Sequence, residues 1–162
     1  MMDILEDALF AAIAAIGFAA ISRPPRRAYI WCGVLAAAGH SLRYILLQPA
    51  FGGSMHIVPA TLVAAFAVGI FAVLLSQVAR MPAETFLFPA LLPMIPGMYA
   101  YRAFGAMAMC VLHGGQAASF GHSFYLMASN TFTCLCVLLA MVVGATIPIF
   151  MLRRMAFCAT RK

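Results

Sequence analysis

Five long apolar stretches alternate with short polar or helix-breaking segments along the chain. They cover about residues 4–21, 28–47, 57–79, 85–112 and 123–152. A helix needs about 20 mostly apolar residues to cross a bilayer, with a range of about 17–25. The pattern therefore predicts an all-α integral membrane protein with a bundle of about five transmembrane helices. We expect a single transmembrane domain over 1–152 and a basic cytoplasmic tail over 153–162.

The fourth apolar stretch contains several residues that interrupt helices. Pro89, Pro93 and Pro96 lie within it, and Gly97 follows the last of them. Each proline removes a backbone donor and clashes with the preceding turn, so the helix is expected to break between Pro93 and Gly97, near mid-membrane. A new helix starting near Met98 would point its first amides into the break and favour an anion. Such breaks mark substrate sites in transporters; a kink without a ligand is the alternative.

Composition and charge place the chain in a membrane. It is 65% hydrophobic and 9% charged, with a mean hydropathy of +1.02, which excludes an ordinary soluble domain. The acidic start indicates a retained first helix rather than a cleaved signal peptide. Arginines occur in the first and third connecting segments and in the tail, whereas the second and fourth segments have none. Because positive loops stay in the cytoplasm, we expect the N-terminus outside and the C-terminus in the cytoplasm.

Two cationic side chains lie inside apolar stretches. Arg43 in the second stretch would cost roughly 2.5–3.5 kcal/mol at membrane depth, so it is expected to face a partner, a water-filled cavity or an anionic ligand. Snorkelling toward the headgroups is the alternative. His40, three residues earlier, shares its helical face and is a candidate proton carrier, although a simple hydrogen-bonding role is also open. Arg102 follows the break in the fourth stretch.

Acidic residues are absent from the middle of every stretch. Asp3, Glu6 and Asp7 lie at the outer end of the first, and Glu84 at the inner end of the fourth. Ion coupling would therefore use His40, the outer acids or a partner subunit. Asn130 belongs to a polar patch in the fifth stretch that serves either helix packing or pathway lining.

The sequence gives little support for a metal site, an enzyme active site or a nucleic-acid-binding module. The spacing of His56, His113 and His122 does not enforce a metal site, and a Cys-x-Cys pair on a helix points its thiols apart. No nucleophile–base arrangement, phosphate loop or nucleic-acid module is apparent. We therefore expect no enzyme activity, cofactor, metal or nucleic-acid partner.

Several motifs carry a family resemblance from about Gly17 to Arg154. Arg27 and Ala28 precede Trp31 and Cys32, and they are followed by Gly39-His40-x-x-Arg43, Pro93-Met94-x-Pro96-Gly97-x-x-Ala100-Tyr101, Asn130 and Ile147-Pro148 before a basic end. The chain resembles the small, C-terminal-half subunit of the split threonine/serine exporter family. Arg102 departs from that pattern.

The resemblance implies a subunit of a two-component exporter, with a larger membrane subunit as partner. Its substrates would be small carboxylates, either amino acids such as threonine and serine or dicarboxylates such as succinate. A non-transporting assembly or stability subunit and a homo-oligomeric channel are the alternatives. The candidate substrate-binding residues are His40, Arg43, Pro93, Pro96, Gly97, Tyr101, Arg102 and Asn130.

Overall fold

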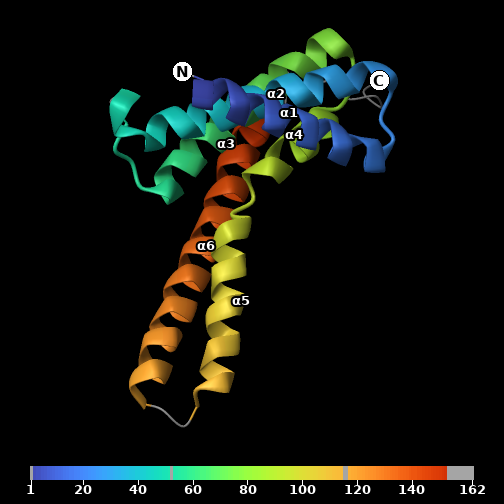
Figure 1. Ribbon diagram of the computed structural model, residues 1–162. Helices are drawn as coiled ribbons and strands as arrows, with labels where there is room; N and C mark the ends of the chain where they lie inside the picture. Colours follow the sequence, from blue (N-terminus) through green and yellow to red (C-terminus); the bar gives the residue numbers. More distant parts are fainter. Residues whose placement is uncertain (1, 52, 115–116, 153–162) are drawn as a thin grey trace. The chain divides into compact units, whose positions relative to one another are not determined.

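The computed structural model describes residues 2–51, 53–114 and 117–152, and within these ranges all regular structure is helical (Figure 1). The elements in chain order are α1 (Met2–Ser22), α2 (Arg26–Leu47), the 3-10 turn η1 (Pro49–Phe51), α3 (Ile57–Ala79), α4 (Glu84–Leu91), the 3-10 turn η2 (Leu92–Met94), α5 (Gly97–Leu112) and α6 (Ala117–Met151). They divide into two compact units. Unit 1 holds the chain up to Met94 together with the end of α6 from Ala140, and unit 2 is Ile95–Leu139.

Four helices are long and apolar enough to cross a membrane: Met2–Ser22, Arg26–Leu47, Ile57–Ala79 and, within α6, Ala118–Met151. They correspond to the first, second, third and fifth predicted stretches, so the all-α membrane class is confirmed. The fourth stretch forms the short helices α4 and α5, and the break between Pro93 and Gly97 is confirmed. The single domain over 1–152 stays a prediction, and the basic tail lies outside the described residues.

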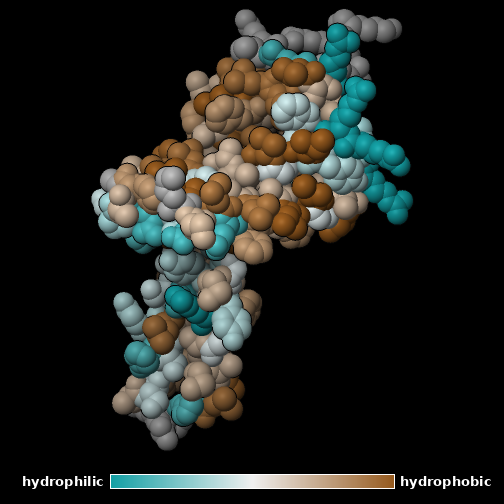
Figure 2. All heavy atoms as spheres, turned by 45° about the horizontal axis from the view of Figure 1, so that its top comes forward, coloured by the Kyte–Doolittle hydropathy of each residue, from teal (hydrophilic) through white to brown (hydrophobic). Residues whose placement is uncertain are grey.

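Unit 1 buries small side chains and exposes large ones. Ala15 and Ala19 of α1 are fully buried on the side that packs against α2, whereas Phe10 and Ile13 of the same helix are 68% and 57% exposed. Small residues let helix backbones approach closely in lipid, where burying large apolar side chains brings no gain over lipid contact. Brown, hydrophobic side chains accordingly cover much of the visible surface in Figure 2. This distribution suits a lipid solvent.

Two glycines fix how α2, α3 and α6 pack in unit 1. A Cβ on Gly39 of α2 would overlap Cγ2 of Val68 on α3, and a Cβ on Gly69 of α3 would come within 2.7 Å of the Ala145 carbonyl of α6. Both positions need the absence of a side chain because the neighbouring helix occupies its space. Gly39 therefore sets the place of α2, the helix that carries His40 and Arg43.

Unit 2 consists of α5 and the first part of α6, which lie side by side (Figure 1). Side chains of both helices, among them Phe104 and Leu135, line an apolar cavity of about 410 Å³. The polar side chains of α6 bond to their own helix: Asn130 donates to the Leu126 carbonyl and Thr131 to the Met127 carbonyl. These bonds satisfy the polar patch locally, as is common for such residues in membrane helices.

Candidate functional site

The break after α4 leaves backbone carbonyls without their usual helical partners. Pro96 has no N–H to offer to the carbonyl of Leu92, and the amide of Gly97 donates to the Ile95 carbonyl at 2.8 Å instead of to Pro93. The last carbonyls of a helix need partners from elsewhere. In unit 1 those partners for η2 come from α2.

Arg43 supplies one of these partners and His40 is placed to supply another. Nη1 of Arg43 donates a hydrogen bond to the Met94 carbonyl at 2.7 Å. Nε2 of His40 lies 3.1 Å from the Pro93 carbonyl and 2.9 Å from Nη2 of Arg43. The structure therefore brings together three of the residues that the sequence singled out, and His40 and Arg43 share a helical face as expected.

Asp7 of α1 completes the cluster. Its Oδ2 lies 2.6 Å from Nδ1 of His40, and the side chains of His40 and Asp7 are 15% and 31% exposed. A carboxylate and a guanidinium therefore flank one imidazole, and their charges offset each other. We call Asp7, His40, Arg43 and the carbonyls of Pro93 and Met94 the polar cluster.

The polar cluster lies between the middle and one end of the spans. His40 precedes the end of α2 at Leu47 by seven residues, which corresponds to about 10 Å of a helix that is about 33 Å long. Asp7 lies five residues after the start of α1 at Met2. The interruption at η2 is at the same level, because its carbonyls meet these side chains. The depth of the break in the membrane stays a prediction.

Sequence reasoning did not include Asp7 among the site residues. It placed this carboxylate at the outer end of the first span, among the acids that could serve ion coupling. A usable signal exists, because consecutive spans joined by a short turn run antiparallel, which brings the start of α1 to the end of α2. Which turn of α1 meets His40 depends on the packing of Ala11, Ala15 and Ala19 against α2.

The other predicted site residues belong to α5, α6 or the linker before them. Pro96 is buried, and the amides of Tyr99 and Ala100 donate to its carbonyl at 3.1 and 3.3 Å. The sequence predicts that the first amides of this helix point into the break, whereas these two amides donate to Pro96. In unit 2, Gly97, Tyr101 and Arg102 are exposed, and Asn130 is half-buried. Their role in binding stays a prediction.

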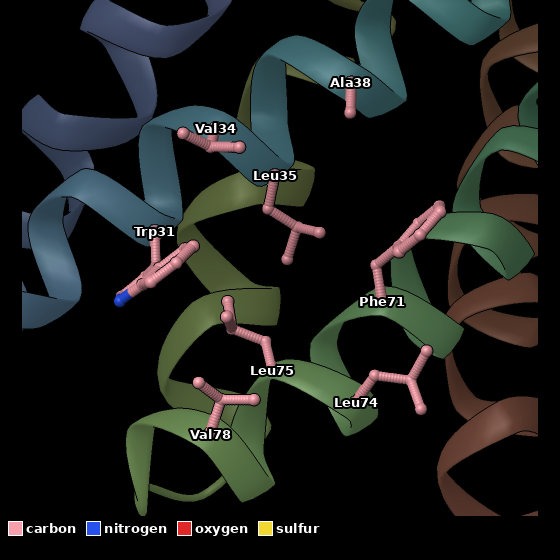
Figure 3. A pocket seen from close by; sticks show the side chains of 8 residues that line it. All are labelled: Trp31, Val34, Leu35, Ala38, Phe71, Leu74, Leu75 and Val78. Atoms are coloured by element: carbon pink, nitrogen blue, oxygen red, sulfur yellow. The ribbon is translucent and has the colours of Figure 1, made fainter.

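An apolar groove of about 370 Å³ lies between α2 and α3 (Figure 3). The indole nitrogen of Trp31 points away from the other labelled side chains. The groove is lined by Trp31, Val34, Leu35, Ala38, Phe71, Leu74, Leu75 and Val78. Nothing in this lining offers a donor to a carboxylate, so the groove does not suit an anionic solute.

Metal binding finds no structural basis in the part of the chain that is described. Within 2–51, 53–114 and 117–152, no group of three or more His, Cys, Asp or Glu side chains lies together as a metal would require. The cysteines of these ranges are free thiols: Cys32, Cys110, Cys134 and Cys136. Cys32 donates weakly to the Thr85 carbonyl at 3.6 Å, which ties α2 to α4.

Comparison with known proteins places the chain in a transporter family. Residues 7–151 match the family model described as "Threonine/Serine exporter, ThrE". A relative from Haemophilus influenzae, described as an uncharacterized protein, is 36% identical over 148 residues, which are 91% of this chain and 47% of the relative. The chain thus spans about half the length of that relative. No solved structure matches the chain.

The family match covers α1 to α6 and includes every residue of the polar cluster. It is a family of transporters rather than of enzymes, and four membrane-length helices fit a multi-pass protein. The chain therefore belongs to the bacterial threonine/serine exporter (ThrE) family.

Proposed function

We propose that this chain is one subunit of a two-component exporter in the bacterial inner membrane, and that the exporter carries small carboxylates. Threonine, serine and dicarboxylates such as succinate belong to this substrate class. The observation that carries the proposal is Arg43, a guanidinium inside a membrane-length helix that donates to the Met94 carbonyl of an interrupted neighbour.

A guanidinium in this setting is suited to a carboxylate. Its planar fork matches the two oxygens of a carboxylate and can donate two parallel hydrogen bonds. In the structure Nη1 of Arg43 donates to the Met94 carbonyl, and Nη2 lies within hydrogen-bond distance of His40. Both acceptors are neutral when His40 is unprotonated. A negatively charged acceptor forms the stronger, charge-assisted bond and can replace either of them.

The carboxylate of Asp7, the second charge of the polar cluster, makes the site selective among solutes. Asp7 offsets the charge of Arg43 in the empty site, so no isolated charge is left at this depth. A solute carboxylate would meet Arg43 on one side and the repulsion of Asp7 beyond His40. We infer that the site distinguishes solutes by where their negative charge lies, and that the ammonium group of an amino acid would favour the Asp7 side.

Size supports the proposal of a second subunit. The relative from Haemophilus influenzae carries in one chain about twice the length of this one, and a few spans alone leave little room for a pathway lined on all sides. The partner would supply the missing half. The alternation of arginine-bearing and arginine-free segments supports an outside N-terminus and a cytoplasmic C-terminus.

Co-expression tests this proposal. Cells that lack their own export of serine and succinate would express this chain alone, the larger subunit alone, or both, and efflux of the labelled solutes would be measured. We expect efflux only with both chains. Full efflux with the larger subunit alone, together with a rise in its accumulation when this chain is added, would instead support an assembly role. Efflux with this chain alone would support a homo-oligomeric channel.

A further inference from the structure

The hydrogen bonds around His40 cannot all exist at once. Nε2 lies within reach of Arg43, which can only donate, and of the Pro93 carbonyl, which can only accept. An imidazole nitrogen either carries a hydrogen or offers a lone pair. Nε2 therefore bonds to Arg43 when it is bare and to Pro93 when it is protonated.

The partner of Nδ1 decides which arrangement exists at a given charge. When Asp7 is a carboxylate it accepts from Nδ1–H, and a neutral His40 then has a bare Nε2 that accepts from Nη2 of Arg43. This gives an unbroken chain from Asp7 through His40 and Arg43 to the Met94 carbonyl. Adding a proton to Nε2 places N–H opposite N–H and breaks the bond to Arg43.

Few other charges act on His40 from the packed elements. Between Ile57 and Ala79, α3 has no ionisable side chain; α4 has only Glu84, in its first turn, and η2 has none. Asp3 and Glu6 of α1 are exposed. On α2 itself Tyr44 follows Arg43, where it accepts from Gln48. Asp7 and Arg43 are therefore the charged groups that respond to the state of His40.

We propose that His40 is a proton-binding site that controls Arg43: a proton on Nε2 moves the imidazole to the Pro93 carbonyl and releases Nη2 of Arg43 for a solute carboxylate. The inference rests on the proposed function for the identity of the solute. Asp7 is a positioning residue in it, because it holds the ring so that the second nitrogen faces Arg43.

The charges of the polar cluster predict whether a proton on His40 strengthens or weakens the binding of a carboxylate. The empty cluster with neutral His40 carries −1 from Asp7 and +1 from Arg43, and a proton on His40 raises the sum to +1. The proton and the carboxylate therefore favour each other's binding, and the linkage is reciprocal. Coupling between two binding events typically changes affinity by about 5–150-fold, so we expect carboxylate affinity to increase by about this factor when His40 gains its second proton.

Nitrogen NMR of the full chain in lipid nanodiscs tests the switch directly. The chain has four histidines, and replacing His56, His113 and His122 with Gln leaves His40 alone. With ¹⁵N-labelled histidine, we expect the Nδ1–H tautomer at the alkaline end of a pH series and a doubly protonated ring at its acidic end. The Nε2–H tautomer at the alkaline end, or a ring that never gains its second proton while the chain stays folded, would overturn the proposal.

The binding of succinate provides the second arm of the test. At a fixed pH the addition of succinate should increase the fraction of doubly protonated His40, and binding of labelled succinate should strengthen as pH falls. His40→Gln keeps an acceptor for Arg43 but cannot gain a proton, so its binding of succinate should change with pH only as far as succinate itself takes up protons. His122→Gln, in α6, is the matched control and should retain the dependence.

The two arms separate failure of the switch from failure of the proposed function. Succinate binding that keeps its full pH dependence in His40→Gln would overturn the switch and leave the carboxylate site intact. An absence of succinate binding at every pH would count against the proposed function. The tautomer of His40, measured by NMR, would still show whether the switch exists.

Discussion

At the scale of single residues, the position of Arg43 matters more than its charge. Its two terminal nitrogens reach different partners, the Met94 carbonyl on η2 and Nε2 of His40 on its own helix. This division depends on the planar fork of a guanidinium, which an ammonium lacks. The residue therefore joins the interrupted helix to the ionisable pair on α1 and α2.

Arg43→Lys should reduce export although it preserves the charge. A lysine cannot donate along two fixed directions, and a hydrogen bond to a charged group contributes about 1.5–3 kcal/mol, so the rate should fall about tenfold or more. Efflux of labelled serine and succinate from cells with both subunits measures this. Arg27→Lys, on the exposed first turn of α2, is the matched control. Unchanged efflux in Arg43→Lys would show that the fork is not used.

Among the elements, the break between α4 and α5 exposes the carbonyls of Pro93 and Met94, which His40 and Arg43 contact. It arises because Pro96 lacks an N–H and Gly97 turns back to the Ile95 carbonyl. Neither effect depends on distant contacts, so the sequence predicts the break from local chemistry.

Replacing Pro93 and Pro96 together with Ala should let α4 continue. The new N–H at position 96 would bond to the Leu92 carbonyl. In the continued helix the amides of Gly97 and Met98 would bond to the carbonyls of position 93 and Met94, so Arg43 would lose its partner at Met94. We expect export to fall while the chain still inserts and resists thermal unfolding at least as well as the native one. Pro89→Ala, inside α4, is the control and should leave export near its normal level. Full export by the double variant would disconnect the break from function.

Helix packing at Gly39 gives a second prediction at this scale. Gly39→Ala places a methyl group against Val68, and overpacking of this kind costs about 1–3 kcal/mol. The midpoint of thermal unfolding in detergent should fall, and Gly39→Ala with Val68→Ala should recover most of the loss. Gly17→Ala, where a Cβ meets open space, should instead keep or raise stability. Equal midpoints for Gly39→Ala and Gly17→Ala would contradict the packing described for α2 and α3.

The elements also show where sequence reasoning stops. The length and hydropathy of α1, α2 and α3 follow from what a bilayer demands, and the shared face of His40 and Arg43 follows from the helical repeat. The contact between Asp7 and His40 does not follow, because it depends on the register between two helices. That register is set by small residues such as Ala15, and many alanine patterns are compatible with several registers.

At the scale of the whole molecule, the distribution of charge predicts how the chain crosses the membrane. Arginines flank the cytoplasmic ends expected for α1 and α3, and the segment between α2 and α3 has none. The polar cluster, formed by the start of α1 and the end of α2, would then lie toward the outer face.

Thiol labelling tests this orientation. In a chain without native cysteines, Ser54→Cys should react with a membrane-impermeant reagent in intact cells, because it lies between α2 and α3. Met81→Cys, after α3, should react only once the membrane is permeabilised. The reverse pattern would invert the orientation and place the polar cluster toward the cytoplasm.

The central claim is that a solute carboxylate binds to the guanidinium of Arg43. Solid-state NMR of the two-subunit complex in lipid measures this directly, with ¹³C in the carboxyl groups of succinate and ¹⁵N in the arginine side chains. We predict a carbon–nitrogen coupling at salt-bridge distance, within about 4 Å, that disappears in Arg43→Lys and persists in Arg27→Lys. Bound succinate whose coupling is the same in Arg43→Lys as in the native chain would contradict the account.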